Sequence, residues 1–162
     1  SSIDHRRQLS PVPLDIHHLI AECADAFKLK VDERNGKIQL VFNAQSTFIL
    51  GDRELLAQAI NNLIDNAEKY SSVAPRIAVI TRDHKDGIEI DIVDQGIGIP
   101  AKMRKRVFEK FFRVQSGDVH NVKGFGLGLN FVKNVIRSHQ GVLRLISELN
   151  KGTEVRIILP KV

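Results

Sequence analysis

Three short segments, spaced about thirty residues apart, constrain what this chain can fold into more than any other feature. The first, Asn62 to Ser71, has helical periodicity and carries two asparagines four residues apart. The second and third are the glycine-containing segments Asp94 to Pro100 and Gly124 to Leu129. A helix with amide side chains beside two glycine-rich loops is suited to holding a nucleotide together with its metal ion.

Around these segments, helical and strand-like patterns alternate along 162 residues, a length that suits one domain. Residues 1–13 are polar with two prolines and indicate a linker, which leaves 14–162 as the folded domain. We expect helices over 18–30, 52–70, 100–112 and 128–139, with Asp52 and Gly141 as caps. We expect strands over 38–42, 47–50, 76–82, 88–93, 142–147 and 153–159, the first two forming a hairpin. Helices interleaved with mainly antiparallel strands predict an α+β fold, a two-layer α/β sandwich.

Charge and cysteine content exclude several classes of protein. The net charge of +5 comes largely from the run Lys102 to Lys110, but the few aromatic residues are spaced like core residues and form no stacking platform among these charges, so we expect no nucleic-acid partner. The single cysteine, Cys23, excludes an internal disulfide and indicates a buried, inert thiol. No apolar run could span a membrane. We expect a cytoplasmic, monomeric domain.

The helix that contains the asparagines has an unusual polar stripe. At 100° per residue an apolar stripe forms from Leu56, Ile60, Leu63 and Ala67. A second narrow arc beside it holds Asn62, Asn66 and Lys69, whereas Asp65 and Glu68 are expected to point to water. The Asn66 carbonyl oxygen suits Mg²⁺, which prefers hard oxygen ligands and retains waters and phosphates. Lys69 could reach those phosphates. The alternative is a pair of exposed amides with a solvated lysine.

The second segment begins with a carboxylate at the end of a strand. Asp94 could accept a hydrogen bond from an exocyclic amine such as adenine N6, and Gly96 and Gly98 would let the backbone approach the base. Ile99 provides apolar cover. A turn with a capping aspartate is the alternative interpretation.

The third segment precedes a helix, where backbone N–H groups make a phosphate site. Gly124, Gly126 and Gly128 do not have the Rossmann spacing, and the chain has no Walker G-K-[ST] motif. A flexible hinge before a helix is the alternative. Two weaker candidates are Arg113, for stabilising transferring phosphate or merely as a solvated arginine, and Thr153, for the base or merely for strand formation.

Together the segments resemble the catalytic and ATP-binding domain of sensor histidine kinases, in the superfamily shared with type II topoisomerases, Hsp90 chaperones and MutL. Asn62 to Ser71 looks like the N box and Asp94 to Pro100 like the G1 box. Phe108 to Arg113 looks like the F box and Gly124 to Leu129 like the G2 box. The resemblance covers residue 14 to the end and implies a Bergerat-type fold with a mobile ATP lid over Val114 to Lys123.

The resemblance also implies a role for each matching residue. Asn66 would bind Mg²⁺, Asn62 would support it, and Lys69 and Arg113 would act on phosphate. The nucleotide, ATP or ADP, would be bound by Tyr70, Asp94, Gly96, Gly98, Ile99, Gly124, Gly126, Leu127, Gly128, Leu129 and Thr153.

One departure from the family pattern limits what the chain can do alone. The six histidines are His5, His17, His18, His84, His120 and His139, and none lies in the expected phosphoacceptor context of an acidic residue followed by Arg-Thr-Pro. The implied activity is therefore transfer of the γ-phosphoryl group of ATP to a histidine on a separate, upstream dimerisation domain. A response regulator would then be an indirect partner, and the full-length protein could be membrane-anchored.

Two alternatives to phosphoryl transfer remain open. The first is an ATPase of the topoisomerase or chaperone type, which is disfavoured because those relatives use a glutamate where this chain has Asn62. The second is a non-catalytic nucleotide-sensing or protein-interaction module.

Overall fold

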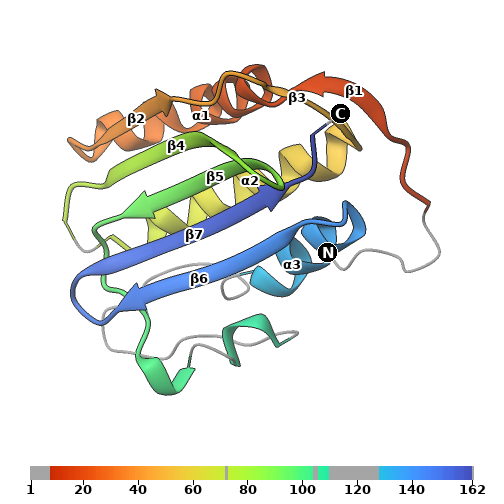
Figure 1. Ribbon diagram of the computed structural model, residues 1–162. Coiled ribbons are helices and arrows are strands. Elements are labelled where there is room, and N and C mark those ends of the chain that lie inside the picture. Colours follow the sequence, from red (N-terminus) through yellow and green to blue (C-terminus); the bar gives the residue numbers. More distant parts are fainter. Residues whose placement is uncertain (1–7, 72, 104–105, 110–127, 162) are drawn as a thin grey trace.

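Three α-helices pack against one face of a five-stranded sheet in the computed structural model, which describes residues 8–71, 73–103, 106–109 and 128–161 (Figure 1). The helices are α1 (Ile16–Glu33), α2 (Arg53–Lys69) and α3 (Leu129–Ser138). The sheet consists of β2 (Lys37–Phe42), β4 (Arg76–His84), β5 (Gly87–Asp94), β6 (Val142–Glu148) and β7 (Gly152–Leu159). The expected two-layer α+β sandwich is confirmed.

The strand order is β2-β4-β5-β7-β6, and β2 with β4 is the parallel pair in an otherwise antiparallel sheet. This register places the end of β5 beside the start of β7, because Asp94 is opposite Thr153. The closing hairpin of β6 and β7 agrees with the sequence prediction. Residues of β5 and β7 therefore meet at one end of the sheet, where the candidate site lies.

The expected hairpin between residues 38–42 and 47–50 is wrong. β3 (Phe48–Gly51) instead pairs antiparallel with β1 (Val12–Asp15) in a separate two-stranded sheet. The chain does not turn back after β2, because the Asp83 carboxylate on β4 accepts the backbone N–H groups of Gln45 and Ser46. Val12 and Pro13, which the sequence indicated as linker, belong to β1.

The ends of the helices show which capping predictions hold. Asp52 caps α2, because its Oδ1 accepts the N–H of Leu55 at 3.1 Å, as predicted. At the end of α3 the left-handed residue is Gln140, with φ 59°, rather than the predicted Gly141. Gly141 donates its N–H to Ile136 O, and a Cβ there would lie 2.7 Å from Ile158 O. Close packing against β7, rather than a positive φ, therefore requires this glycine.

The basic segment after Pro100 is not the expected helix over its described residues. It forms two short 3₁₀ turns, Ala101–Met103 and Arg106–Phe108. In these turns only Val107 is buried, so the segment lacks the packed apolar face on which most helices depend.

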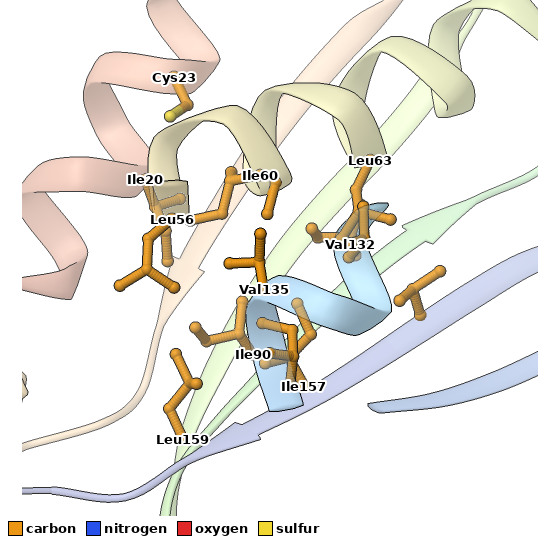
Figure 2. Close-up of a cluster of buried hydrophobic side chains, with 14 of the residues drawn as sticks. Ile20, Cys23, Leu56, Ile60, Leu63, Ile90, Val132, Val135, Ile157 and Leu159 are labelled. Atoms are coloured by element: carbon orange, nitrogen blue, oxygen red, sulfur yellow. The ribbon is translucent and has the colours of Figure 1, made fainter. Parts of the chain in front are cut away.

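The core lies between the helices and the sheet (Figure 2). Side chains from all three helices meet β5 and β7 there, and Ile20, Leu56, Ile90 and Val135 are at most 1% exposed. Cys23 is buried at its edge, and desolvation raises the pKa of this thiol to about 11, as expected for an unreactive cysteine. Across the described ranges, none of the helices combines the length and apolar character needed to cross a membrane.

Candidate functional site

A pocket opens where the C-terminal half of α2 meets the ends of β5 and β7. Its empty volume, including the space open to solvent at the mouth, is about 530 Å³. Most of its lining is apolar, and its polar side chains are those of Asn66, Tyr70, Asp94 and Thr153. The lining residues are Leu63, Asn66, Ala67, Tyr70, Ile92, Asp94, Ile97, Gly98, Ile99, Leu129, Leu145, Thr153 and Val155.

Asp94 supplies the carboxylate of this pocket from the end of β5. Its Oδ1 accepts the N–H of Gly96 at 2.8 Å and that of Thr153 at 3.2 Å. Burial nevertheless raises the pKa of the Asp94 carboxyl to about 6, because desolvation outweighs these two hydrogen bonds. Two backbone N–H groups thus orient the carboxylate by binding its Oδ1. Its burial in the pocket disfavours the charged form.

The loop after Asp94 is held against two neighbouring segments. Ile97 donates its N–H to Tyr70 O at 3.1 Å and accepts the N–H of Asn150 at 2.7 Å. Gly98 has φ 72°, and a Cβ there would lie 2.0 Å from Glu148 O. A glycine is therefore required at this position by its positive φ and by the close approach of the Glu148 backbone. The proposed approach of Gly96 and Gly98 to a base remains a prediction.

Asn62 and Asn66 of α2 are hydrogen-bonded to each other, and Asn62 lies beside the start of α3. Asn66 Nδ2 donates to Asn62 Oδ1 at 3.3 Å, so the Asn66 oxygen is the end of the amide turned away from Asn62. A Cβ at Gly128, which has φ 64°, would lie 2.3 Å from Asn62 Nδ2. The fold therefore brings the helix and the end of the third segment together. A neutral amide oxygen at a pocket rim fits Mg²⁺, which takes few protein ligands beside phosphates and waters.

Lys69 and its neighbours are arranged differently from the sequence expectation. Lys69 Nζ lies 2.8 Å from Asp65 Oδ2, so in this structure the lysine is ion-paired on its own helix. Glu68 does not point to water, because its side chain is 4% exposed and pairs with Arg34 at 3.2 Å. The partner is distant in the sequence, which is why periodicity alone placed Glu68 wrongly.

Other predicted residues divide into those near the pocket and those outside the described residues. Tyr70, Ile99, Leu129 and Thr153 line the pocket. The Thr153 hydroxyl lies 2.8 Å from Ser147 Oγ. The positions outside the described residues are Arg113, Gly124, Gly126, Leu127 and the proposed lid over 114–123.

Sequence reasoning missed two kinds of site residue. Leu145 and Val155 line the pocket from β6 and β7, but in the sequence they look like ordinary core strand residues. Ser147 holds the loop through its Oγ, which accepts the N–H of Ile99 at 2.7 Å. An isolated serine in a strand gives no signal of this contact, since the loop it binds is 48 residues away.

The raised pKa of Asp94 predicts a pH-dependent stability. The carboxyl titrates at 3.8 ordinarily and at about 6 in the folded chain, so folding favours its protonated form. Its destabilising effect is absent below pH 3.8 and complete above pH 6, where it is at most about 3 kcal/mol. Asp94→Asn should therefore be more stable than the unchanged chain at pH 7.5, with the advantage fading toward pH 4. Urea unfolding at both pH values measures this; an equal difference at both would contradict it.

Comparison with known proteins identifies the family. Residues 51–162 match the model of the "Histidine kinase-, DNA gyrase B-, and HSP90-like ATPase" family. The chain is 42% identical over 149 residues to the sensor protein RprX of Bacteroides fragilis, covering 91% of this chain and 29% of RprX. It is 35% identical over 149 residues to the sensor-like histidine kinase SenX3 of Mycolicibacterium smegmatis, covering 91% of this chain and 38% of SenX3. The chain thus spans roughly a third of the length of these relatives.

Solved structures give the same result. The mycobacterial sensor histidine kinase MprB superposes with a TM-score of 0.76 at 31% identity, over 93% of this chain and 97% of that one. Full-length ShkA in complex with AMPPNP superposes with a TM-score of 0.80 at 26% identity, over 95% of this chain and 32% of ShkA. With the fold and the pocket described above, these likenesses show that the chain belongs to the histidine kinase-, DNA gyrase B- and HSP90-like ATPases, as the catalytic ATP-binding domain of a sensor histidine kinase.

Proposed function

We propose that this domain binds Mg-ATP in the pocket between α2 and the ends of β5 and β7, and donates the γ-phosphoryl group to a histidine on a separate helical domain. The observation that supports this most is the placement of Asp94 and Asn66 on opposite elements of one pocket. In the proposed pose, the Asp94 carboxylate accepts the adenine N6–H group and the apolar lining holds the ring. The phosphates then extend toward Asn66, Asn62 and Gly128.

The chemistry requires little covalent participation from the protein. Phosphoryl transfer depends mainly on positioning the nucleotide and on stabilising developing charge. Bound Mg²⁺ would supply charge neutralisation at the phosphates. Asn66 would present its amide oxygen to the ion, and Lys69 would exchange Asp65 for phosphate as its partner. The acceptor imidazole would come from a dimerisation domain, for which the greater length of the relatives leaves room, and a response regulator would receive the phosphoryl group next.

Calorimetric titration with ADP and with a non-hydrolysable ATP analogue, each with and without Mg²⁺, tests the proposal. We expect one saturable site, with the triphosphate analogue bound more tightly when Mg²⁺ is present. No binding at millimolar nucleotide would overturn it and favour a protein-interaction module. Steady ADP release from ATP without any acceptor would instead favour the ATPase alternative.

A further inference from the structure

Arg34, in the turn between α1 and β2, binds the backbone at the end of α2. Its guanidinium donates to the carbonyl oxygens of Glu68 and Ser71, each at 2.6 Å, and to that of Val73 at 3.3 Å. We propose that Arg34 is a positioning residue of the nucleotide pocket, acting through the α2 terminus on Tyr70 and on the loop after Asp94. This inference rests on the proposed nucleotide binding.

The end of α2 is a place where an arginine has a strong effect. The last turn of a helix leaves carbonyl oxygens without helical partners and carries a partial negative charge. A planar guanidinium presents several N–H donors in a fixed fork, which a lysine cannot reproduce. Arg34 uses this fork to bind two carbonyls three residues apart, at Glu68 and Ser71. The backbone between them is thereby held at both ends.

Tyr70 lies between these two anchored carbonyls and connects them to the pocket. Its own carbonyl oxygen accepts the N–H of Ile97, and both Tyr70 and Ile97 line the pocket. A Cβ at Gly96 would lie 2.6 Å from the same oxygen, so the loop packs closely against this backbone. A displacement of residues 68–71 would therefore move one wall of the pocket and the loop that faces it.

A simpler role for Arg34 is to neutralise Glu68. The Glu68 side chain is 4% exposed and lies 3.2 Å from Arg34 and 3.7 Å from Lys30, so a buried charge is compensated here. The two roles are separable, because the bonds to the Glu68 and Ser71 carbonyl oxygens do not require the Glu68 carboxylate. Glu68→Gln removes the carboxylate charge and keeps the contacts of Arg34 with the backbone. Arg34→Met removes those backbone contacts and also leaves the Glu68 charge without its arginine partner.

The experiment compares Arg34→Met, Arg34→Lys, Glu68→Gln and the double variant Arg34→Met with Glu68→Gln. Arg53→Met is the matched control, since Arg53 pairs with Glu22 between α1 and the start of α2, away from the pocket. Calorimetry with ADP gives the affinity, thermal unfolding gives the stability, and the backbone amide signals of Gly96 and Ile97 report the loop without nucleotide.

We expect Arg34→Met and the double variant to bind ADP about tenfold more weakly, with shifted Gly96 and Ile97 amide signals, and Arg34→Lys to fall between. Glu68→Gln and Arg53→Met should stay within about twofold of the unchanged chain. Restored affinity in the double variant, or equal losses in Glu68→Gln and Arg34→Met, would assign Arg34 to charge balance alone and overturn the proposal. If Arg34→Met does not fold, Arg34→Lys and the double variant still decide the matter. If the unchanged chain binds no ADP, the proposed function fails, whereas the amide signals still test the positioning.

Discussion

Asn66→Ala is expected to abolish the Mg²⁺-dependent part of the triphosphate affinity. The amide oxygen of Asn66 is the proposed protein ligand, and alanine offers no oxygen in its place. We expect the ATP analogue to bind this variant no more tightly with Mg²⁺ than without it. Its affinity in the presence of Mg²⁺ should therefore be at least about tenfold lower than that of the unchanged chain. Binding of ADP without Mg²⁺ should change little, because the base and the apolar lining are untouched. Calorimetry with and without Mg²⁺ measures both quantities.

Asn61→Ala is the matched control for this experiment. Asn61 lies on the same helix but lines the groove between α1 and α2 instead of the nucleotide pocket. Its Oδ1 is buried with no hydrogen-bond partner among the described residues, so losing the amide should not weaken folding. An Asn66→Ala variant that kept its response to Mg²⁺ would remove the metal role from Asn66. Equal losses in both variants would point to a general effect on α2.

Local patterns marked Asn62, Asn66 and Asp94 separately as candidates, whereas their meeting in one site was implied by the family resemblance. The asparagines share one narrow arc of an amphipathic helix, and Asp94 ends a strand just before a glycine turn. Both signals are local, and the fold brings α2 and the end of β5 to the same pocket. Local periodicity therefore marked the separate segments, and the resemblance supplied the expectation that they form one site.

The contacts that support the site could not be predicted in the same way. Glu68 is buried because Arg34 reaches it from 34 residues away, and Ser147 holds the loop at Ile99 from 48 residues away. β2 pairs in parallel with β4, and just beyond β2 the Asp83 carboxylate accepts the backbone N–H groups of Gln45 and Ser46. Each of these involves contacts between residues far apart in the sequence, for which a single sequence has no periodic signature.

Asp94→Asn is expected to weaken ADP binding by about a hundredfold, since a site built around a polar contact rejects a mismatched partner strongly. Asparagine keeps an Oδ1 that can accept the N–H groups of Gly96 and Thr153, so the loop should stay in place. Its NH₂ group replaces the second carboxylate oxygen, however, and would face the adenine amine donor to donor. The loss therefore reports the base contact and not unfolding, which circular dichroism and thermal unfolding verify.

The same substitution should change the preference among bases. The side-chain NH₂ group that Asp94→Asn introduces can donate to the 6-oxo group of hypoxanthine. The variant should therefore bind inosine diphosphate at least as tightly as it binds ADP. Asp86→Asn, which removes an equal charge from the exposed turn between β4 and β5, should leave both affinities unchanged. Titration of the three proteins with both diphosphates measures the preference. Unaltered ADP affinity in Asp94→Asn would show that the Asp94 carboxylate does not accept a hydrogen bond from the adenine amine, and so does not read the base.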